Sequence, residues 1–142
     1  DTELNQTIKE NGIRILNDEK TTINGDIVLV GRSDAEWYIN TGRINVSEIL
    51  NESDLSKYVI VVDHQPLDEV KNSKSGVDLQ VSGHTHAGQV FPFKEIIEYE
   101  GIHSYGEYTI GDMNQIVSSG LTGWGWGIRN EGKCEYVLIN IN

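Results

Sequence analysis

The sequence predicts an α/β fold built on a mixed sheet whose C-terminal section is antiparallel. A β-branched run from Val59 to Val62 is typical of a buried central strand. A second strand-like stretch, residues 77–83, follows it after a helical segment, which is the pattern of a βαβ unit. From Tyr105 onward, apolar and polar residues alternate between glycine-containing turns, as in antiparallel strands. The length requires no second domain, so residues 1–142 are predicted to form one.

The N-terminal part is expected to contribute helices at both ends of a pair of strands. Residues 2–11 are predicted to be helical, because Leu4 and Ile8 lie one turn apart and Gly12 follows where helices commonly end. The remaining elements are strands over residues 13–16 and 26–31 and a short helix over residues 44–53 with Ser47 as its N-cap.

The middle of the chain predicts the βαβ unit in more detail. A strand over residues 57–64 ends on His64, a helix follows over residues 65–76, and the strand over residues 77–83 leads to His84. Parallel strands joined by a helix end at the same edge of a sheet, where functional residues usually lie. The two histidines are therefore expected at one edge.

The C-terminal part is expected to form antiparallel sheet. Its strands are predicted over residues 105–111, 114–120 and 133–141. Glycine-rich turns separate them, so strands that are neighbours in the sequence are expected to pair.

Composition limits the partners that the chain can bind. Lysine and arginine total 11 against 22 aspartates and glutamates, so the formal net charge is −11. No basic surface is available to follow a phosphate backbone, and nucleic-acid binding through basic surface is not expected. Bound divalent cations could still supply the positive field that a phosphate ester needs. Cys134 is the single cysteine, so no disulfide forms within the chain.

Histidines form the most specific candidate site. His84 and His86 stand two residues apart between glycines, so in an extended segment both imidazoles point the same way. His64, at the end of the neighbouring predicted strand, adds a third imidazole, and imidazoles are common metal ligands. The sequence therefore predicts that three histidines converge on a metal site. The alternative is a turn with exposed histidines.

Two polar residues allow two interpretations each. Asp63 either orients a histidine or is a solvated or capping carboxylate, and alternation along the strand, which points it away from His64, favours the second. His103 is interpreted as a surface histidine that could contact a substrate.

The segment "GLTGWGWGIRN", residues 120–130, combines tryptophans, glycines and an arginine. Trp126 and Trp124 could form an aromatic wall beside a pocket, although packing in the interior is the favoured interpretation. Arg129 could meet either a phosphate or an acidic side chain. Trp126 and Arg129 are therefore candidate substrate-binding residues together with His103.

Three stretches in this order resemble a known family. They are "VVDHQP", "SGHTHAGQ" about 20 residues later, and "IVSSGLTGWGWGIRN". The combination resembles the C-terminal half of the calcineurin-like metallophosphoesterase family, in the bacterial branch whose last metal motif reads G-H-T-H-G/A-G-Q. The motif of residues 83–89 is specific, and the rest is supporting pattern.

The resemblance implies a fold, a reaction and metal ligands. The fold is a four-layer α/β/β/α sandwich with two divalent metal ions, Mn, Fe or Zn, above the strand ends. His64 and His84 would bind one ion and His86 the other. The implied reaction is hydrolysis of phosphomonoesters or phosphodiesters by metal-activated hydroxide, with a phosphate-ester small molecule or a lipid-linked phosphate as substrate. No catalytic residue is assigned within this chain.

Family members also carry upstream D-x-H, G-D-x-x-D and G-N-H-E/D motifs, which this sequence lacks. The chain is therefore expected to be the C-terminal portion of a larger phosphoesterase, with partial or no metal occupancy and little hydrolysis on its own. Strand surface left exposed is expected to cause self-association, a disordered N-terminal segment, or both. The chain itself is expected to be soluble, and the larger protein to be cytoplasmic or anchored to a membrane by an N-terminal segment.

Two other functions stay open at this point. A noncatalytic or mononuclear zinc-binding module could use His64, His84 and His86 as its ligands. A carbohydrate-binding module would depend on Trp124 and Trp126 alone.

Overall fold

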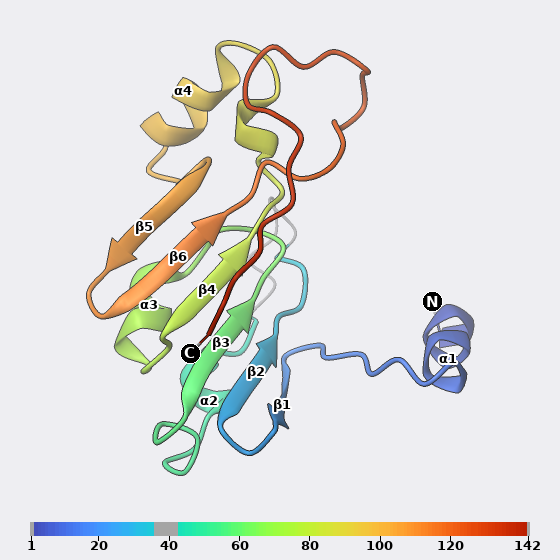
Figure 1. Ribbon diagram of the computed structural model, residues 1–142, viewed down its shortest axis with the longest axis vertical. Helices are drawn as coiled ribbons and strands as arrows, with labels where there is room; N and C mark the ends of the chain where they lie inside the picture. Colours follow the sequence, from blue (N-terminus) through green and yellow to red (C-terminus); the bar gives the residue numbers. More distant parts are fainter. Residues whose placement is uncertain (1, 36–42, 142) are drawn as a thin grey trace.

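The computed structural model describes residues 2–35 and 43–141 and shows an α/β fold with one six-stranded sheet of order β1-β2-β3-β4-β6-β5 (Figure 1). The strands are β1 (Glu19–Ile23), β2 (Ile27–Gly31), β3 (Tyr58–Val62), β4 (Leu79–Ser82), β5 (Gly106–Ile110) and β6 (Met113–Val117). The helices are α1 (Thr2–Glu10), α2 (Val46–Ile49), α3 (Glu69–Lys74) and α4 (Phe93–Tyr99), with a short 3-10 turn, η1 (His86–Gly88).

The sheet is mixed, with parallel strands inside and an antiparallel strand at each edge. The four inner strands, β2, β3, β4 and β6, all run parallel to one another. The edge strand β1 pairs antiparallel with β2, and the edge strand β5 pairs antiparallel with β6. α3 connects β3 to β4 and completes the predicted βαβ unit. The mixed sheet, its antiparallel β5–β6 section and the inner position of β3 confirm the predictions from the sequence.

One face of the sheet packs against α2 and α3 and contains the core. Alternate side chains of each strand point to this face. Gln80 of β4 lies there too, and it accepts a hydrogen bond from Asn72 Nδ2 at 2.9 Å and donates to the Leu67 carbonyl at 3.0 Å. The buried apolar cluster consists of Val28, Val30, Val46, Val59, Val61, Val77 and Met113.

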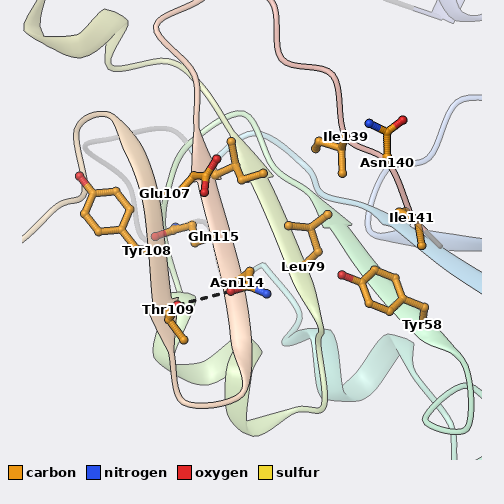
Figure 2. Close-up of a pocket in the computed structure, with 11 residues that line it drawn as sticks. Tyr58, Leu79, Glu107, Tyr108, Thr109, Asn114, Gln115, Ile139, Asn140 and Ile141 are labelled. Carbon is orange, nitrogen blue, oxygen red and sulfur yellow. Dashed lines mark hydrogen bonds between the residues drawn. The ribbon is translucent and has the colours of Figure 1, made fainter.

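The opposite face of the sheet also carries apolar side chains. In the described part of the chain, the C-terminal segment rather than a helix crosses this face (Figure 1). Val62, the last residue of β3, is 43% exposed on this face. A pocket of about 610 Å³ opens over the amino-terminal ends of β3 and β4, which begin at Tyr58 and Leu79, with Asn114 and Ile139 among its other walls (Figure 2). This pocket is therefore separate from the carboxyl ends of β3 and β4.

Three elements differ from the predictions. Residues 13–16 form no strand, and the first strand is β1, a largely polar edge strand that the apolar pattern does not reveal. Residues 133–141 alternate like a strand but belong to none of the strands in the described chain. α4 was not predicted. Phe93, Ile96 and Ile97 do have helical spacing, but no residue of α4 is fully buried, and Phe93, for example, is 55% exposed.

Helix ends follow local hydrogen bonding. α1 ends before Gly12, whose φ of 76° matches the predicted cap. α2 begins after Asn45 rather than at Ser47, and the Asn45 backbone N–H donates to the Glu48 carboxylate at 2.8 Å. α3 begins only at Glu69. Within residues 2–35 and 43–141, no helix has the length and apolar character needed to span a bilayer.

Candidate metal centre

Two imidazoles meet at the carboxyl edge of the sheet. His64 follows β3 and His84 follows β4, and the pairing of Val62 with Val81 brings the ends of these strands side by side. His84 Nδ1 lies 2.8 Å from His64 Nε2, and the ring centroids are 4.6 Å apart in an edge-to-face arrangement. The structure thus brings together two of the three predicted histidines.

The spacing of this pair is close to that of two ligands on one metal ion. Imidazole nitrogens bind zinc at about 2.0–2.1 Å, so two of them on one tetrahedral ion lie roughly 3.3 Å apart. The observed separation of 2.8 Å is shorter than this, so the two rings would have to move apart by roughly 0.5 Å to share an ion. Among the described residues, no three His, Cys, Asp or Glu side chains come together as a metal-binding group. The pair therefore fits part of a coordination shell and not a complete one.

Electrostatics favour the metal-binding form of His84. Burial lowers the pKa of its imidazole below the ordinary value of 6.5, and the imidazole of His64 lowers this pKa further, while the Asp34 carboxylate acts in the opposite direction. A lowered pKa keeps the ring neutral near pH 7, and only a neutral imidazole offers a lone pair to a cation.

His86 lies in the same turn but outside the His64–His84 contact. Its Nδ1 is 3.0 Å from the Thr122 carbonyl oxygen. Arg129 Nη2 also lies 3.4 Å from this Nδ1, a longer contact than that of the carbonyl. Because a carbonyl only accepts hydrogen bonds, the shorter contact favours the proton on Nδ1, which leaves Nε2 as the nitrogen that can bind a metal. The expected extended geometry is wrong, since φ is 69° at His84 and 51° at His86. Alternation therefore does not direct the two rings to one point.

The backbone of the turn is held in an uncommon conformation. His84, His86, Ala87, Gly88 and Gln89 all have positive φ. Each non-glycine residue held there costs on the order of 1 kcal/mol or more, and such residues concentrate at functional sites. Gly88 is also required by space, because a Cβ atom there would clash with the backbone nitrogen of Lys94, the second residue of α4.

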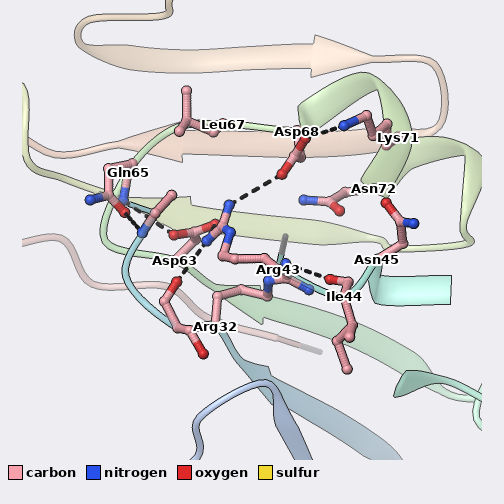
Figure 3. A network of polar contacts seen from close by, with 12 residues as sticks. Arg32, Arg43, Ile44, Asn45, Asp63, Gln65, Leu67, Asp68, Lys71 and Asn72 are labelled. Atoms are coloured by element: carbon pink, nitrogen blue, oxygen red, sulfur yellow. Dashed lines mark hydrogen bonds and ion pairs between the residues drawn. The ribbon is translucent and has the colours of Figure 1, made fainter. Parts of the chain in front are cut away.

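A buried ion-pair network supports the loop that carries His64 (Figure 3). The Arg43 guanidinium donates to Asp63 at 2.9 Å and to Asp68 at 3.2 Å. Asp63 is 2% exposed, so it is not solvated, but its carboxylate does cap the local backbone by accepting from the Gln65 N–H at 3.3 Å. Burial raises the pKa of the Asp63 carboxyl even though Arg43 and Arg32 lower it, as expected for a desolvated ion pair.

The Trp loop, residues 121–128, lies beside the His86 turn. Trp124 is 77% exposed and Trp126 is 74% exposed, so the interpretation that they pack in the interior is wrong. Arg129 directs its guanidinium to the backbone carbonyls of His86 at 3.0 Å and Thr122 at 2.9 Å. Its partners here are carbonyls and not an acidic side chain.

His103 lies on the sheet, at β5 and β6. Its Nδ1 is 2.6 Å from Gln115 Oε1, and its ring stacks on Tyr108 with centroids 3.7 Å apart. It is half-buried, so it is not a simple surface histidine. Its contact with a substrate stays a prediction, as does that of Arg129.

Two residues that organise this region were not predicted as site residues, although Gln89 closes the motif of residues 83–89. Gln89 is 9% exposed and bonds to the backbone of the Trp loop. Glu135 accepts hydrogen bonds from the Tyr105 hydroxyl at 2.9 Å, the Ser118 hydroxyl at 3.1 Å and the Ser119 backbone N–H at 3.1 Å. The other available signal is the glycine-rich loop itself, whose backbone groups must find partners.

Replacing Glu135 with glutamine is expected to destabilise the fold at neutral pH by about 1–2 kcal/mol, because charge-assisted hydrogen bonds are lost. Burial raises the pKa of this carboxyl, but the hydrogen bonds from Ser119, Tyr105 and Ser118 outweigh burial and hold the pKa below the ordinary 4.5. A depressed pKa contributes stability above 4.5 that is lost as the pH falls through the folded-state value. Urea unfolding of both proteins should therefore show a difference at pH 7 that closes in acid.

The matched control for this prediction is Glu107→Gln on the exposed side of β5. It should leave the unfolding midpoint unchanged at both pH values. A Glu135→Gln difference that persists undiminished in acid would show that the ionised carboxylate is not the source of the stability.

Known relatives of the chain share one description. An uncharacterized metallophosphoesterase of Campylobacter jejuni is 34% identical over 98 residues, which are 68% of this chain and 26% of that protein. One of Helicobacter pylori is 40% identical over 100 residues, 68% of this chain and 27% of that protein. One of Aquifex aeolicus is 36% identical over 93 residues, 62% of this chain and 35% of that protein. The chain belongs to the metallophosphoesterase family.

The metallophosphoesterase relatives confirm the resemblance drawn from the histidine motifs. The chain spans about a quarter to a third of the length of the curated relatives it matches. No family model matches the sequence, and no solved structure matches it. The mixed sheet with its α3 crossover is consistent with the α/β architecture expected of a metallophosphoesterase.

Proposed function

We propose that this chain forms part of a dinuclear metal-dependent phosphoesterase that hydrolyses phosphomonoesters or phosphodiesters. The observation that carries the proposal is the 2.8 Å contact between His84 Nδ1 and His64 Nε2 beyond the carboxyl ends of β4 and β3. Relatives named as metallophosphoesterases support the class of reaction.

In the proposed site, His64 and His84 hold one divalent ion and His86 holds a second through Nε2. Manganese, iron and zinc all suit imidazole ligands combined with carboxylates. When bound, two such ions activate a water and neutralise the charge that develops on the phosphoryl oxygens. The remaining ligands are proposed to lie outside this sequence, because the relatives extend well beyond the matched region. The isolated chain is then expected to hold little metal and to be inactive or nearly so.

The proposed substrate is a phosphate-ester small molecule or a lipid-linked phosphate. Trp126, exposed on a loop beside the His86 turn, supports an apolar group on the ester. Arg129 and His103 are weaker candidates, because the guanidinium bonds to backbone carbonyls and the imidazole to Gln115. A substrate contact by the Arg129 Nη nitrogens would have to replace one of these bonds.

We also propose that the sheet face crossed by the C-terminal segment packs against a second sheet, as in a four-layer sandwich. Partly exposed apolar side chains from neighbouring strands support this, since Leu29 and Ile60 are register partners on that face. In the isolated chain, the same face is the proposed site of self-association.

Metal content by elemental analysis and turnover of bis-p-nitrophenyl phosphate and p-nitrophenyl phosphate with Mn²⁺ test the proposed function. The purified chain should contain less than one tightly bound metal and show no turnover. The same protein extended by its upstream coding sequence should gain manganese-dependent turnover that His84→Ala removes. If a metal-loaded extended protein hydrolyses neither ester, the proposed reaction class is wrong.

The alternative of a mononuclear zinc module predicts a different result. One tightly bound zinc per chain, lost equally in His64→Ala, His84→Ala and His86→Ala, would favour it. The separation of His86 from the His64–His84 contact argues against that outcome.

A further inference from the structure

The Trp loop combines exposed apolar side chains with a fixed backbone. Leu121 is 69% exposed and Ile128 63%, and the two indoles between them are more exposed still. Glycines occupy positions 123, 125 and 127, a composition that by itself favours many conformations. Something other than side-chain packing must therefore hold this backbone in place.

Gln89 supplies the backbone contacts of the loop. Its Nε2 donates to the Trp124 carbonyl at 2.9 Å and to the Ile128 carbonyl at 3.1 Å, and it lies 3.3 Å from the Trp126 carbonyl. Its Oε1 accepts from the Trp124 backbone N–H. The buried amide thus bonds to three alternate residues of the loop and turns their side chains outward.

The close approach depends on a glycine. A Cβ atom at Gly123 would lie 3.1 Å from Gln89 Oε1, tighter than most side-chain contacts. The Gln89 carbonyl also accepts from the backbone N–H groups of Asn130 at 3.0 Å and Glu131 at 3.1 Å, where the chain leaves the loop. Gln89 therefore binds both the inside and the end of the loop.

The loop in turn contacts His86. The Thr122 carbonyl, inside the loop, lies 3.0 Å from His86 Nδ1 and also accepts from Arg129 Nη2 at 2.9 Å. A second nitrogen of Arg129 donates to the His86 carbonyl at 3.0 Å. Arg129 Nη2, which can only donate, also lies 3.4 Å from His86 Nδ1, so the proton stays on Nδ1 only while the shorter contact with the loop carbonyl is kept.

We propose that Gln89 is a positioning residue that acts on His86 through the Trp loop. By fixing the loop it fixes the Thr122 carbonyl, which keeps the proton of His86 on Nδ1 and reserves Nε2 for a metal. The inference rests on the proposed function in one respect, namely that His86 is a metal ligand. The structural part, from Gln89 to the tautomer of His86, can be tested without metal.

The chemistry requires an amide at position 89. Leucine matches glutamine in size but neither donates nor accepts. Glutamate accepts from the Trp124 N–H but places carboxylate oxygens against carbonyl oxygens, which repel them. Both Gln89→Leu and Gln89→Glu are therefore expected to release the loop.

The decisive measurement is the tautomer of His86 by long-range ¹H–¹⁵N NMR at pH 8 without metal. The wild-type protein should show the Nδ1–H tautomer, and both Gln89 variants should lose it in favour of a mixture with Nε2–H. Gln80→Leu is the matched control, because Gln80 is also buried and also donates to a backbone carbonyl, at Leu67, but on the helix-covered face. It should keep the Nδ1–H tautomer whatever its effect on stability.

Chymotrypsin digestion gives a second readout. Trp124 is 77% exposed and Tyr136 is 82% exposed, and both offer an aromatic side chain to the protease, so exposure and side-chain class alone predict similar cleavage at the two sites. With the loop held by Gln89, cleavage after Trp124 should be slower, and Gln89→Leu should accelerate it roughly tenfold, the effect of losing one or two hydrogen bonds.

Several outcomes would overturn the inference. They are equal wild-type cleavage at the two sites, an Nε2–H tautomer in the wild-type protein, or an Nδ1–H tautomer that survives in both Gln89 variants. A tautomer that responds as expected, in a protein whose extended form binds no metal, would instead retain the positioning role and reject the proposed function.

Discussion

Replacing His84 with alanine is expected to lower the affinity of the protein for Zn²⁺ by at least roughly 10–100-fold. That is the cost of losing a residue that only hydrogen-bonds to a metal ligand, and His84 is proposed to bind the ion directly. His84 Nδ1 and His64 Nε2 lie 2.8 Å apart, so a shared ion would lose one of its two imidazoles from this chain. The lowered pKa of His84 adds to the effect, since this ring is ready to bind without releasing a proton near pH 7. Competition with a chromophoric chelator measures the affinity.

His103→Ala is the matched control for this prediction. His103 is also a half-buried imidazole, but its Nδ1 bonds to Gln115 and its ring stacks on Tyr108. The control should bind Zn²⁺ as the wild type does. If wild type and His84→Ala bind Zn²⁺ with equal affinity, the His64–His84 pair is not the metal site.

Replacing Asp63 with alanine is expected to lower the free energy of unfolding by about 3–5 kcal/mol, a large share of the roughly 5–15 kcal/mol typical of a domain. The reason is the partner left behind, since the Arg43 side chain is only 7% exposed and would lose its 2.9 Å contact. Burial already raises the pKa of Asp63, so the intact pair contributes little net stability of its own. Urea unfolding measures the change.

Asp68→Ala provides a control on the same arginine. Its carboxylate contacts Arg43 at 3.2 Å but is 32% exposed, so solvent screens the interaction and the cost should be about 1 kcal/mol or less. The double variant Asp63→Ala with Arg43→Ala should be less destabilised than the sum of the single variants. Equal effects of Asp63→Ala and Asp68→Ala would contradict the role assigned to burial.

The central βαβ unit could be predicted from the sequence because its signals are local and agree with one another. The β-branched run of β3 and the strand that leads to His84 specify two parallel strands, and parallel strands place their ends together. The contact between His64 and His84 follows from that topology. The turn around His86 could not be predicted in the same way, because five positive φ values replace the alternation on which the prediction depended.

The remaining differences between prediction and structure arise where a residue depends on partners that are distant in the sequence. Residues 133–141 alternate as a strand does, but a strand also needs a neighbour with free backbone groups, and alternation does not reveal one. Gln89 is equally hidden, because its role depends on carbonyls 35 to 39 residues away. Asp63 was misjudged since its partner, Arg43, is 20 residues away.

Anomalous diffraction at the zinc edge, from crystals of the protein grown with Zn²⁺, tests the central claim most directly. The account predicts an ion about 2.0–2.1 Å from both His84 Nδ1 and His64 Nε2, with the His86 ring outside its coordination shell. An ion bound by all three histidines at once, or full zinc occupancy elsewhere with none at this pair, would contradict it.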